Sequence, residues 1–380
     1  MSRLPGRTAF VLDPSAAYLN HASFGATPRS VLKAQRGIQD ELEAQPMAFF
    51  AGLMPRLRRA MAPVAATLGA PLDDIAFVDN ASTGTSAVLR SMDLGPGDAI
   101  LTTSHAYAAV AKALNWMVER TGCTLRVAPV PWPLEDADQV EAAVHGTWRP
   151  DVRLAVLDHV ASVSASRFPV ERLVPWLQER GARVLIDGAH VPGQVPVDLD
   201  ALGADWWTGN LHKWAFTPKG CAVLYARPDA QPDLDPPVLS HFLGEGFAPS
   251  FEKPGTRDPS AWLAVPAAWA FVDAAGGWDA VQAHNNARAR QLGKRLEAEL
   301  GLRPLAPDAL LHHMVPFELP GVPATREAAH AFVRQVWERH RVQLWCMPLL
   351  GRMVLRVSGQ LYVSSADEDR MVAAVRAELP

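Results

Sequence analysis

The sequence lacks several features that would assign it to whole classes of proteins. Its 380 residues include three cysteines, Cys123, Cys221 and Cys346, which are too few and too scattered for a disulfide framework or a CxxC metal site. It has no stretch of about 20 apolar residues, and its N-terminus has no continuous apolar segment typical of a secretion signal. We therefore expect a cytoplasmic protein that is neither secreted nor inserted in a membrane.

An excess of charge of one sign is also missing. The formal net charge is −4 and no long run of lysine or arginine occurs, so we expect neither a nucleic-acid nor a membrane partner. His312 and His313 form no zinc pattern with a second ligand pair, and we predict no metal site. No GxGxxG follows the early strand-like runs, which argues against a nicotinamide cofactor.

The composition present is that of a globular protein with a large core. Hydrophobic residues make up 49% and charged residues 20% of the chain. Because 380 residues exceed what one hydrophobic core usually serves, two domains are expected.

Short apolar runs alternate with helical patterns over the first 230 residues. The strand-like runs are Ile75–Asp79, Ala99–Thr102, Thr124–Val130, Leu154–Asp158, Val184–Asp187 and Ala222–Tyr225. The helical patterns cover residues 27–45, 82–92, 106–120 and 170–180. This alternation predicts an α/β fold with a mostly parallel sheet covered by helices on both faces. Ligands bind at the carboxyl ends of such strands, where we expect Asp79, Asn80, His105, Asp158, His159 and Asp187.

The character of the sequence changes after a proline-rich stretch near residue 235. Helical patterns then cover residues 260–275, 278–300 and 326–339, with a last helix near residue 365, and strand-like runs cover residues 310–317, 342–346 and 353–357. We therefore predict an N-terminal arm of residues 1–25, a large α/β domain of residues 26–245 and a small C-terminal α+β domain of residues 246–380.

Two segments carry the strongest chemical signal, Asp187-Gly-Ala-His190 and Gly209-Asn-Leu-His-Lys213-Trp. They supply a carboxylate at a strand end and a lysine 26 residues later (213 − 187 = 26). Pyridoxal phosphate (PLP) requires both groups: an anion keeps its pyridine nitrogen protonated, and an amine forms a Schiff base with it. The sequence therefore predicts a PLP enzyme.

In order along the chain, eight segments resemble the class V aminotransferase family of PLP enzymes, and within it most closely the isopenicillin N epimerase-like branch. They are Asn20-His-Ala-Ser-Phe-Gly25, Asn80-Ala-Ser-Thr83, Thr102-Thr-Ser-His-Ala-Tyr107, Asp158-His-Val-Ala-Ser162, Asp187-Gly-Ala-His190, Gly209-Asn-Leu-His-Lys-Trp214, Gly255-Thr256 and Arg356-Val-Ser-Gly-Gln-Leu-Tyr362. The resemblance implies the fold of PLP-dependent transferases of fold type I, which is similar to aspartate aminotransferase, and an amino-acid substrate.

The resemblance also implies roles for residues around the cofactor. Lys213 would form the Schiff base and move protons at the substrate Cα, and Asp187 would pair with the pyridine nitrogen. Ser82 and Thr83 stand at a predicted helix N-terminus, which suits a phosphate. The ring over the pyridine would be His105, a catalytic residue, or else Tyr107. The other predicted cofactor contacts are Ser162 and His190, at the phenolic oxygen, His212, and Thr256.

Substrate contacts and assembly follow from the same resemblance. Arg356 would bind the α-carboxylate through two parallel hydrogen bonds, with Arg352 and Arg167 as competing candidates. Asn20 and His21 would line the substrate pocket together with Tyr107. Gly255-Thr256 resembles a phosphate contact that the other subunit donates, which implies a homodimer.

The reaction type stays open at this point. The leading hypothesis is an epimerase acting at Cα, which needs a second proton carrier besides Lys213, from among His21, His105 and Tyr107. The alternatives are a C–S lyase, a cysteine desulfurase or selenocysteine lyase in which Cys346 accepts the sulfur or selenium, an aminotransferase, and a non-catalytic PLP-binding protein. Cys346 lies in an apolar strand-like run, where a cysteine is usually a small buried side chain.

Overall fold

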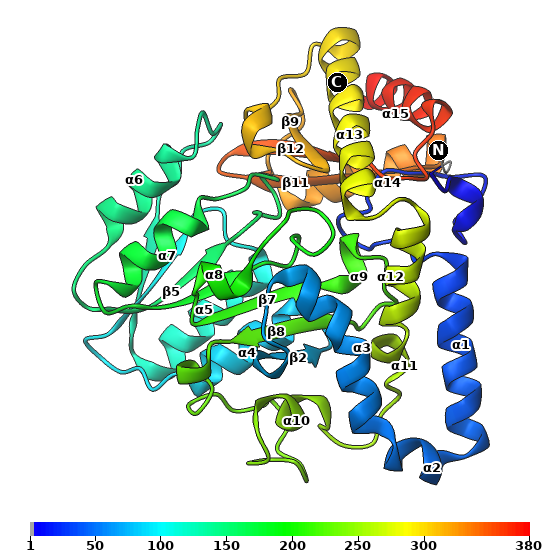
Figure 1. Cartoon of the computed structure of the whole chain (residues 1–380). Helices are drawn as coiled ribbons and strands as arrows, with labels where there is room; N and C mark the ends of the chain where they lie inside the picture. Colours follow the sequence, from blue (N-terminus) through cyan, green and yellow to red (C-terminus); the bar gives the residue numbers. More distant parts are fainter. Residues whose placement is uncertain (1–3) are drawn as a thin grey trace.

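The computed structural model describes residues 4–380, so the first three residues of the predicted N-terminal arm lie outside the described residues. In this range the chain forms a seven-stranded sheet, a three-stranded sheet and a two-stranded pairing (Figure 1). None of the helices in residues 4–380 is long and apolar enough to cross a membrane.

The seven-stranded sheet has the strand order β2-β8-β7-β6-β5-β3-β4. Its strands are β2 (Ile75–Val78), β3 (Ala99–Thr103), β4 (Thr124–Ala128), β5 (Val152–Asp158), β6 (Arg183–Asp187), β7 (Trp206–Asn210) and β8 (Ala222–Ala226). Only β8, among these strands, runs antiparallel to its neighbours, so the predicted mostly parallel α/β sheet is confirmed. The six predicted strands are present, and β7 is an additional one that the sequence patterns did not indicate.

Helices cover both faces of this sheet. They are α1 (Arg29–Ala44), α2 (Pro46–Ala51), α3 (Leu53–Leu68), α4 (Ala81–Ser91), α5 (Ala108–Thr121), α6 (Asp138–Thr147), α7 (Val170–Gln178), α8 (Leu199–Leu202), α9 (Leu211–Trp214), α10 (Phe247–Glu252), α11 (Ser260–Leu263) and α12 (Val265–Ala274). Alternate residues of β6 enter different cores. Val184 and Ile186 belong to a hydrophobic cluster that also contains residues of α3, α6, α7 and α12, whereas Leu185 belongs to a second cluster that contains residues of α4, α5 and α10.

The predicted helix over residues 260–275 is interrupted at Ala264, which separates α11 from α12. Pro266 lies in the first turn of α12 and has no N–H to donate to the carbonyl of Trp262. The single-helix prediction is therefore wrong at this point.

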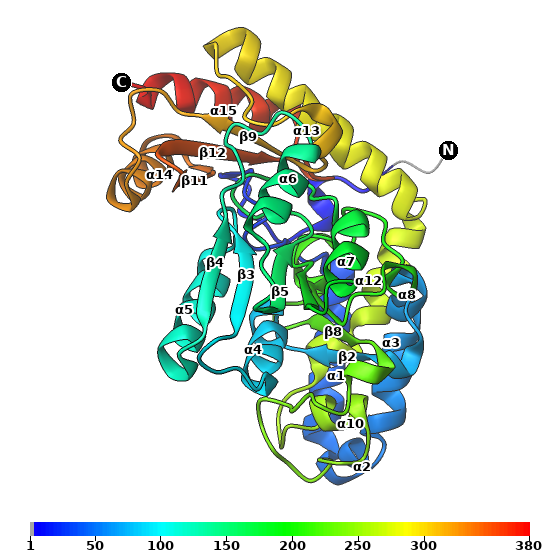
Figure 2. The ribbon, with the colours of Figure 1, turned by 90° about the vertical axis from the view of Figure 1, so that its left-hand side faces the viewer.

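A second, antiparallel sheet of order β11-β12-β9 lies in the C-terminal part. It consists of β9 (Met314–Glu318), β11 (Trp345–Leu349) and β12 (Arg352–Ser358), and α13 (Trp278–Leu300), α14 (Arg326–His340) and α15 (Ser365–Glu378) pack beside it (Figure 2). The strand predicted over residues 342–346 is divided, because β10 (Val342–Gln343) turns away to pair with β1 (Ala17–Tyr18). The proposed domain division at residue 245 stays a prediction.

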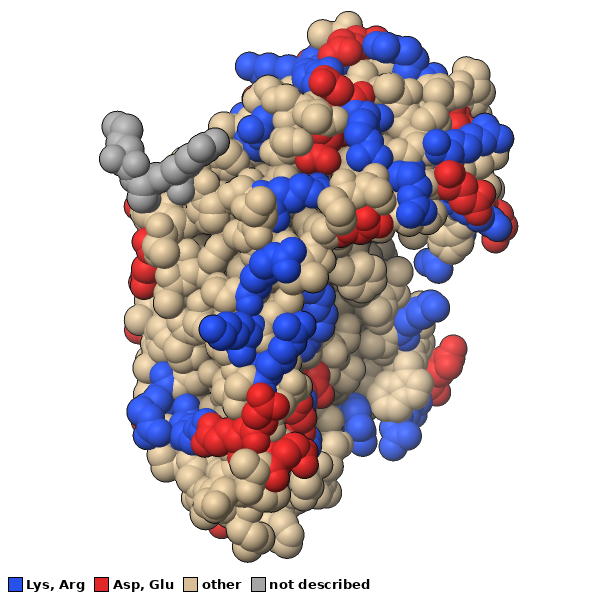
Figure 3. Space-filling view, turned by 90° about the vertical axis from the view of Figure 1, so that its right-hand side faces the viewer, with Lys and Arg blue, Asp and Glu red and all other residues tan. Residues whose placement is uncertain are grey.

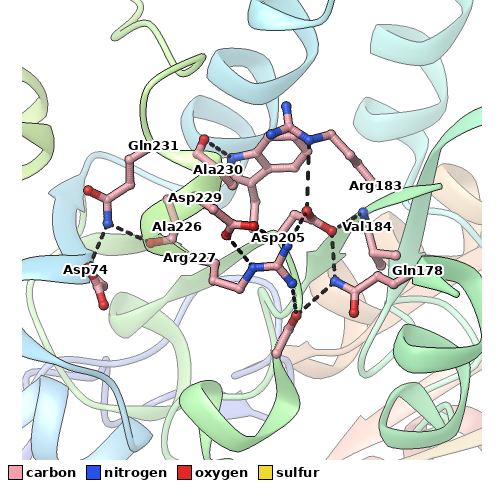
Figure 4. A network of polar contacts seen from close by, with 12 residues as sticks. Asp74, Gln178, Arg183, Val184, Asp205, Ala226, Arg227, Asp229, Ala230 and Gln231 are labelled. Atoms are coloured by element: carbon pink, nitrogen blue, oxygen red, sulfur yellow. Dashed lines mark hydrogen bonds and ion pairs between the residues drawn. The ribbon is translucent and has the colours of Figure 1, made fainter. Parts of the chain in front are cut away.

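Asp205 organises a polar network next to the amino ends of β6 and β7 (Figure 4). Its side chain is almost fully buried and accepts hydrogen bonds from Val184 N at 2.8 Å, Gln178 Nε2 at 2.9 Å and Arg227 Nη2 at 3.1 Å. Arg183 Nε lies 3.9 Å from the same carboxylate. The buried charge is thus fully paired and joins α7, β6, β7 and β8.

Replacing Asp205 by alanine is expected to lower the free energy of unfolding by about 3 kcal/mol, because a buried ion pair and two further donors lose their acceptor. Denaturant titration would measure this. The matched control is Asp229→Ala, which removes an exposed carboxylate from the same Arg227 and should cost less than about 1 kcal/mol. Equal losses in the two variants would contradict the assigned role of Asp205.

Candidate active site

The carboxyl ends of the parallel strands open into a cavity of about 770 Å³. Figure 3 shows that the surface of the molecule is hollowed between its upper and lower parts, with acidic and basic side chains mixed around it. Nine of the predicted site residues line the cavity: Asn20, Ser82, Tyr107, Ser162, Asp187, His190, His212, Lys213 and Arg356. The structure therefore brings together side chains that are up to 336 positions apart in the sequence (356 − 20 = 336).

Lys213 lies in the short helix α9, directly after β7. Its Nζ atom is 3.0 Å from Nε2 of His190. Burial lowers the pKa of Lys213 to about 7; the nearby Asp187 carboxylate opposes this shift and the Arg356 guanidinium adds to it. A large fraction of Lys213 is therefore a neutral amine, and hence a nucleophile, near pH 7.

Asp187 ends β6 and is the register partner of Asp158, which ends β5. Both carboxylates are buried at the cavity. Burial raises the pKa of Asp158 well above its ordinary value, and the neighbouring Asp187 adds to the shift. Burial also raises the pKa of Asp187, but the N–H of Ala189, which donates to Asp187 Oδ1 at 2.9 Å, and Lys213 both counteract it. We therefore assign the proton to Asp158 and the negative charge to Asp187.

Arg356 points from β12 into the cavity and is 1% exposed. It donates to the carbonyl oxygen and, at 3.3 Å, to the hydroxyl of Ser162, and to Ser23 Oγ at 3.3 Å, while its guanidinium lies 4.3 Å from the ring centre of Trp345. Burial lowers the pKa of Arg356 to about 9. Within residues 4–380 no carboxylate pairs with it, so this buried cation favours an anionic ligand.

The N-terminal segment packs against the backbone of the lysine helix. Asn20 reaches the cavity, whereas His21, also predicted to contact the substrate, lies outside the cavity lining. His21 is fully buried outside the cavity lining, with Nε2 2.8 Å from the carbonyl oxygen of Lys213 and Nδ1 2.9 Å from the hydroxyl of Tyr362. A side chain at Gly25 would collide with the same carbonyl, since its Cβ would lie 2.2 Å from the oxygen. His21 and Gly25 therefore position Lys213.

Three predicted cofactor residues, His105, Thr83 and Thr256, lie outside the cavity lining. His105 is buried between Trp132 and Phe168, with Nδ1 3.0 Å from Ser164 Oγ, because the turn after β3 directs its ring into the core. The prediction that His105 covers the cofactor is therefore not supported, whereas the second choice, Tyr107, does line the cavity.

Unlike Ser82, Thr83 and Thr256 do not line the cavity. The N–H of Thr83 donates to Oδ1 of Asn80, the residue that caps α4, at 2.9 Å, while Ser82 faces the cavity. Thr256 is exposed between α10 and α11 and does not reach the cavity of its own chain. Its contribution to a second subunit stays a prediction.

Several residues at the outer part of the cavity are not indicated by the sequence patterns. They are Phe24, Lys219, Arg326, His330, Trp345 and Met347. Arg326 and His330 are one helical turn apart at the start of α14, which is the only sequence signal that they share. Nothing in the sequence shows which side of that helix meets the carboxyl ends of distant strands.

Comparisons with known proteins agree with this geometry. The sequence profile named Aminotransferase class-V matches residues 17–335, so the chain belongs to the class V aminotransferase family. Enzymes of this family use PLP, and the protein is accordingly a PLP-dependent enzyme. The predicted family, fold class and cofactor are thus confirmed.

Individual relatives have different names. A putative L-cysteine desulfhydrase 1 of Oryza sativa subsp. japonica is 38% identical over 81% of this chain and 68% of its own length. The isopenicillin N epimerase of Streptomyces clavuligerus is 29% identical and covers 98% of this chain and 97% of its own. The solved structure of a C-DES mutant with glycine linked to its PLP cofactor has a TM-score of 0.83 at 22% identity, covers 98% of this chain and 99% of that one, and shows the shared fold.

The residues present fit PLP. The cavity contains the amine of Lys213, whose pKa is lowered by burial. Within residues 4–380, no basic side chain donates a hydrogen bond to the ionised carboxylate of Asp187. The start of α4 borders the cavity and offers the positive end of a helix to a phosphate. Nδ1 of the buried His190 also lacks a partner within the described range. No group of three histidine, cysteine or acidic side chains within that range could hold a metal ion.

The lowered pKa of Lys213 predicts how the cofactor-free enzyme takes up PLP. Only the neutral amine can attack the aldehyde, so the loading rate should rise about tenfold per pH unit below pH 7 and level off above it. Stopped-flow absorbance would follow the loading. An N-acetyl-lysine control, with an ordinary pKa near 10.4, should keep rising to about pH 10. A protein profile that follows the control would contradict the pKa assignment.

Proposed function

We propose that this enzyme is a C–S lyase that cleaves the Cβ–S bond of L-cysteine or an S-substituted L-cysteine and releases a thiol, pyruvate and ammonia. The observation that carries the proposal is that the cavity places Lys213, an amine whose pKa burial lowers to about 7, together with Asp187 and Arg356. The names of the desulfhydrase relatives, which are 32–38% identical, support the same chemistry.

A single proton carrier is sufficient for this elimination. Arg356 holds the α-carboxylate, and the neutral Lys213 takes the proton from Cα. PLP, when bound, supplies the electron sink for the pair of electrons that this leaves. The electron pair from Cα then forms the Cα=Cβ double bond while the Cβ–S bond breaks with its electrons on sulfur, and the Lys213 ammonium gives its proton to the thiolate. The released 2-aminoacrylate takes up water and gives pyruvate and ammonia.

The remaining site residues control charge and position in this reaction. Asp187 holds a fixed negative charge at the end of β6, in a buried site where charges interact strongly. His190 Nε2 lies 3.0 Å from Lys213 Nζ, and burial holds the pKa of His190 well below the ordinary value, so a neutral imidazole with its proton on Nδ1 can accept a hydrogen bond from that amine. His21 and Gly25 hold the lysine backbone in place.

Cys346 decides between this lyase and a desulfurase. Its thiol is buried in β11 and does not line the cavity, and burial raises its pKa to about 12, so it is a thiol and not a reactive thiolate near pH 7. We expect Cys346→Ala to retain turnover within about twofold of the original enzyme, because a buried inert cysteine acts only by packing. A loss of sulfur release at unchanged PLP content would indicate that Cys346 accepts the sulfur.

An epimerase is the second candidate. The epimerase from Streptomyces clavuligerus matches nearly the whole chain, and Tyr107 lines the cavity beside Arg356, where its hydroxyl could be the second proton carrier. This reaction would exchange the Cα proton and invert the stereocentre without breaking a carbon–sulfur bond.

One experiment separates the two functions. The holoenzyme is incubated in D₂O with L-cysteine, S-substituted L-cysteines and other L-amino acids, and the products are followed by NMR and by pyruvate and thiol assays. Pyruvate and thiol in equal amounts support the lyase. Deuterium at Cα together with the D-enantiomer, and no pyruvate, would reject it in favour of the epimerase.

The assembly remains part of the proposal. We infer a homodimer in which Gly255-Thr256 of each chain completes the cavity of the other. The exposed position of Thr256 outside its own cavity supports this arrangement. The cytoplasmic location stays a prediction.

A further inference from the structure

The outer part of the cavity is basic. Arg326 and His330 line it from α14, and both are exposed to solvent. They are four residues apart and therefore lie on the same side of the helix, next to the side that Ala329, Phe332 and Val336 bury. Figure 2 shows α14 and β11 facing the large sheet near β3 and β4.

The positive charge of Arg326 is not stabilised by the dipole of its own helix. Arg326 is the first residue of α14, next to the positive end of the helix dipole, where cations are disfavoured. In residues 4–380 no acidic side chain forms an ion pair with it. An anion in the cavity would relieve this repulsion.

The acidic residues of the cavity do not compensate for Arg326. Three acidic side chains line it: Asp79, which pairs with Arg257, and Asp158 and Asp187, which end β5 and β6. These carboxylates belong to the strand ends of the large sheet. The wall from which Arg356 projects carries instead Trp345 and Met347, on β11.

We propose that the cavity selects amino acids with a second carboxylate at the far end of the side chain, bound by Arg326 and His330 while Arg356 binds the α-carboxylate. Trp345 and Met347 offer apolar contact to the carbon chain between the two charges. This inference rests on the proposed function for the chemistry at Cα. Under that function the substrate is an S-substituted cysteine whose leaving thiol carries the carboxylate.

Two substrates of nearly equal size test the selectivity in the holoenzyme: S-(2-carboxyethyl)-L-cysteine and its uncharged counterpart S-propyl-L-cysteine. We expect Arg326→Gln to lower kcat/KM for the carboxyethyl substrate about tenfold, mainly through KM, and to change the value for the propyl substrate less than about twofold. The matched control is Arg334→Gln, an exposed arginine of α14 that does not line the cavity. It should change neither value.

Binding without turnover tests the inference independently of the reaction. Glutarate and butyrate cannot react with the cofactor, and calorimetry of the holoenzyme should show tighter binding of glutarate, a preference that Arg326→Gln removes. If neither cysteine derivative is cleaved but this preference is found, the lyase fails and the anion site stands. Equal effects of Arg326→Gln on the charged and uncharged substrates, or no preference for glutarate, would overturn the inference.

Discussion

Lys213→Ala is expected to abolish the absorption band of the lysine-linked cofactor and to lower turnover by roughly 10⁴-fold or more, because one side chain supplies both the covalent attachment and the proton transfer at Cα. Lys219, the other lysine that lines the cavity, is not expected to replace it, because its Nζ donates to the carbonyl oxygen of Gly25. Absorption spectra and pyruvate release measure the two effects separately.

Two further variants make the Lys213 result specific. Lys213→Arg introduces a long cationic side chain that has no amine able to form the bond, and should be as inactive as the alanine variant. Lys33→Ala removes an exposed lysine from α1 and should leave spectrum and turnover unchanged. Partial recovery of Lys213→Ala by added methylamine would support the proton-transfer role. A Lys213→Ala protein that retains the band and the activity would remove the central assignment.

Asp187→Asn should have the second largest effect, a fall in kcat of about 10³-fold with little change in the fold. Asparagine has the same shape and can still accept the hydrogen bond from Ala189 N–H, so the variant removes the charge and keeps the contact. Without a fixed anion, the protonated form of the pyridine ring loses its stabilisation. Steady-state kinetics measure the fall, and circular dichroism verifies the fold.

The neighbouring Asp158 provides the control. Because burial and Asp187 raise the pKa of Asp158 well above its ordinary value, Asp158 is the carboxyl group of the pair that holds a proton more readily, and Asp158→Asn should lower kcat by about tenfold or less. In the Asp187→Asn protein the repulsion is gone, and Asp158 can ionise and replace part of the missing charge. The double variant should therefore be slower than Asp187→Asn alone. Equal losses in the two single variants would contradict the assignment of the charge to Asp187.

Local patterns predicted the elements whose apolar spacing is regular. Helix α13 begins at Trp278 and ends at Leu300, as its pattern indicates, and α14 differs from its prediction by one residue. Helix α3 was missed although its apolar residues recur at helical spacing. Strand β7 was missed because Trp206-Trp-Thr-Gly-Asn210 has neither a period of two nor a β-branched apolar run, and tertiary packing decides its conformation.

The site was predictable as far as its residues follow strand ends or a family motif. Lys213, Asp187 and Arg356 belong to such segments, and the structure brings them to one cavity. His21 and His105 could not be judged in the same way, because whether a motif residue faces a cavity or the core depends on packing against distant side chains such as Tyr362 and Trp132. Sequence spacing contains no information on that choice.

The coupling of Asp158 to Asp187 also required the structure. The two residues are 29 positions apart (187 − 158 = 29), and only the register of β5 against β6 makes them neighbours. Since a pKa shift of this kind arises between groups a few ångströms apart, the charge state of the pair follows from sheet topology and not from the two motifs.

The pairing of β1 with β10 joins Ala17 to Val342, 325 residues later (342 − 17 = 325). During synthesis on the ribosome the strands of the large sheet are complete once Ala226 has emerged, and the lysine and aspartate are then already in the chain. Arg356 emerges 130 residues later (356 − 226 = 130). The pairing of β1 with β10 closes a very long segment of chain, and it can form only after the residues beyond Ala226 begin to fold. The enzyme is therefore expected to complete its substrate-binding site only at the end of translation. A prematurely terminated chain that lacks Arg356 could form much of the large sheet but would not bind an amino-acid substrate.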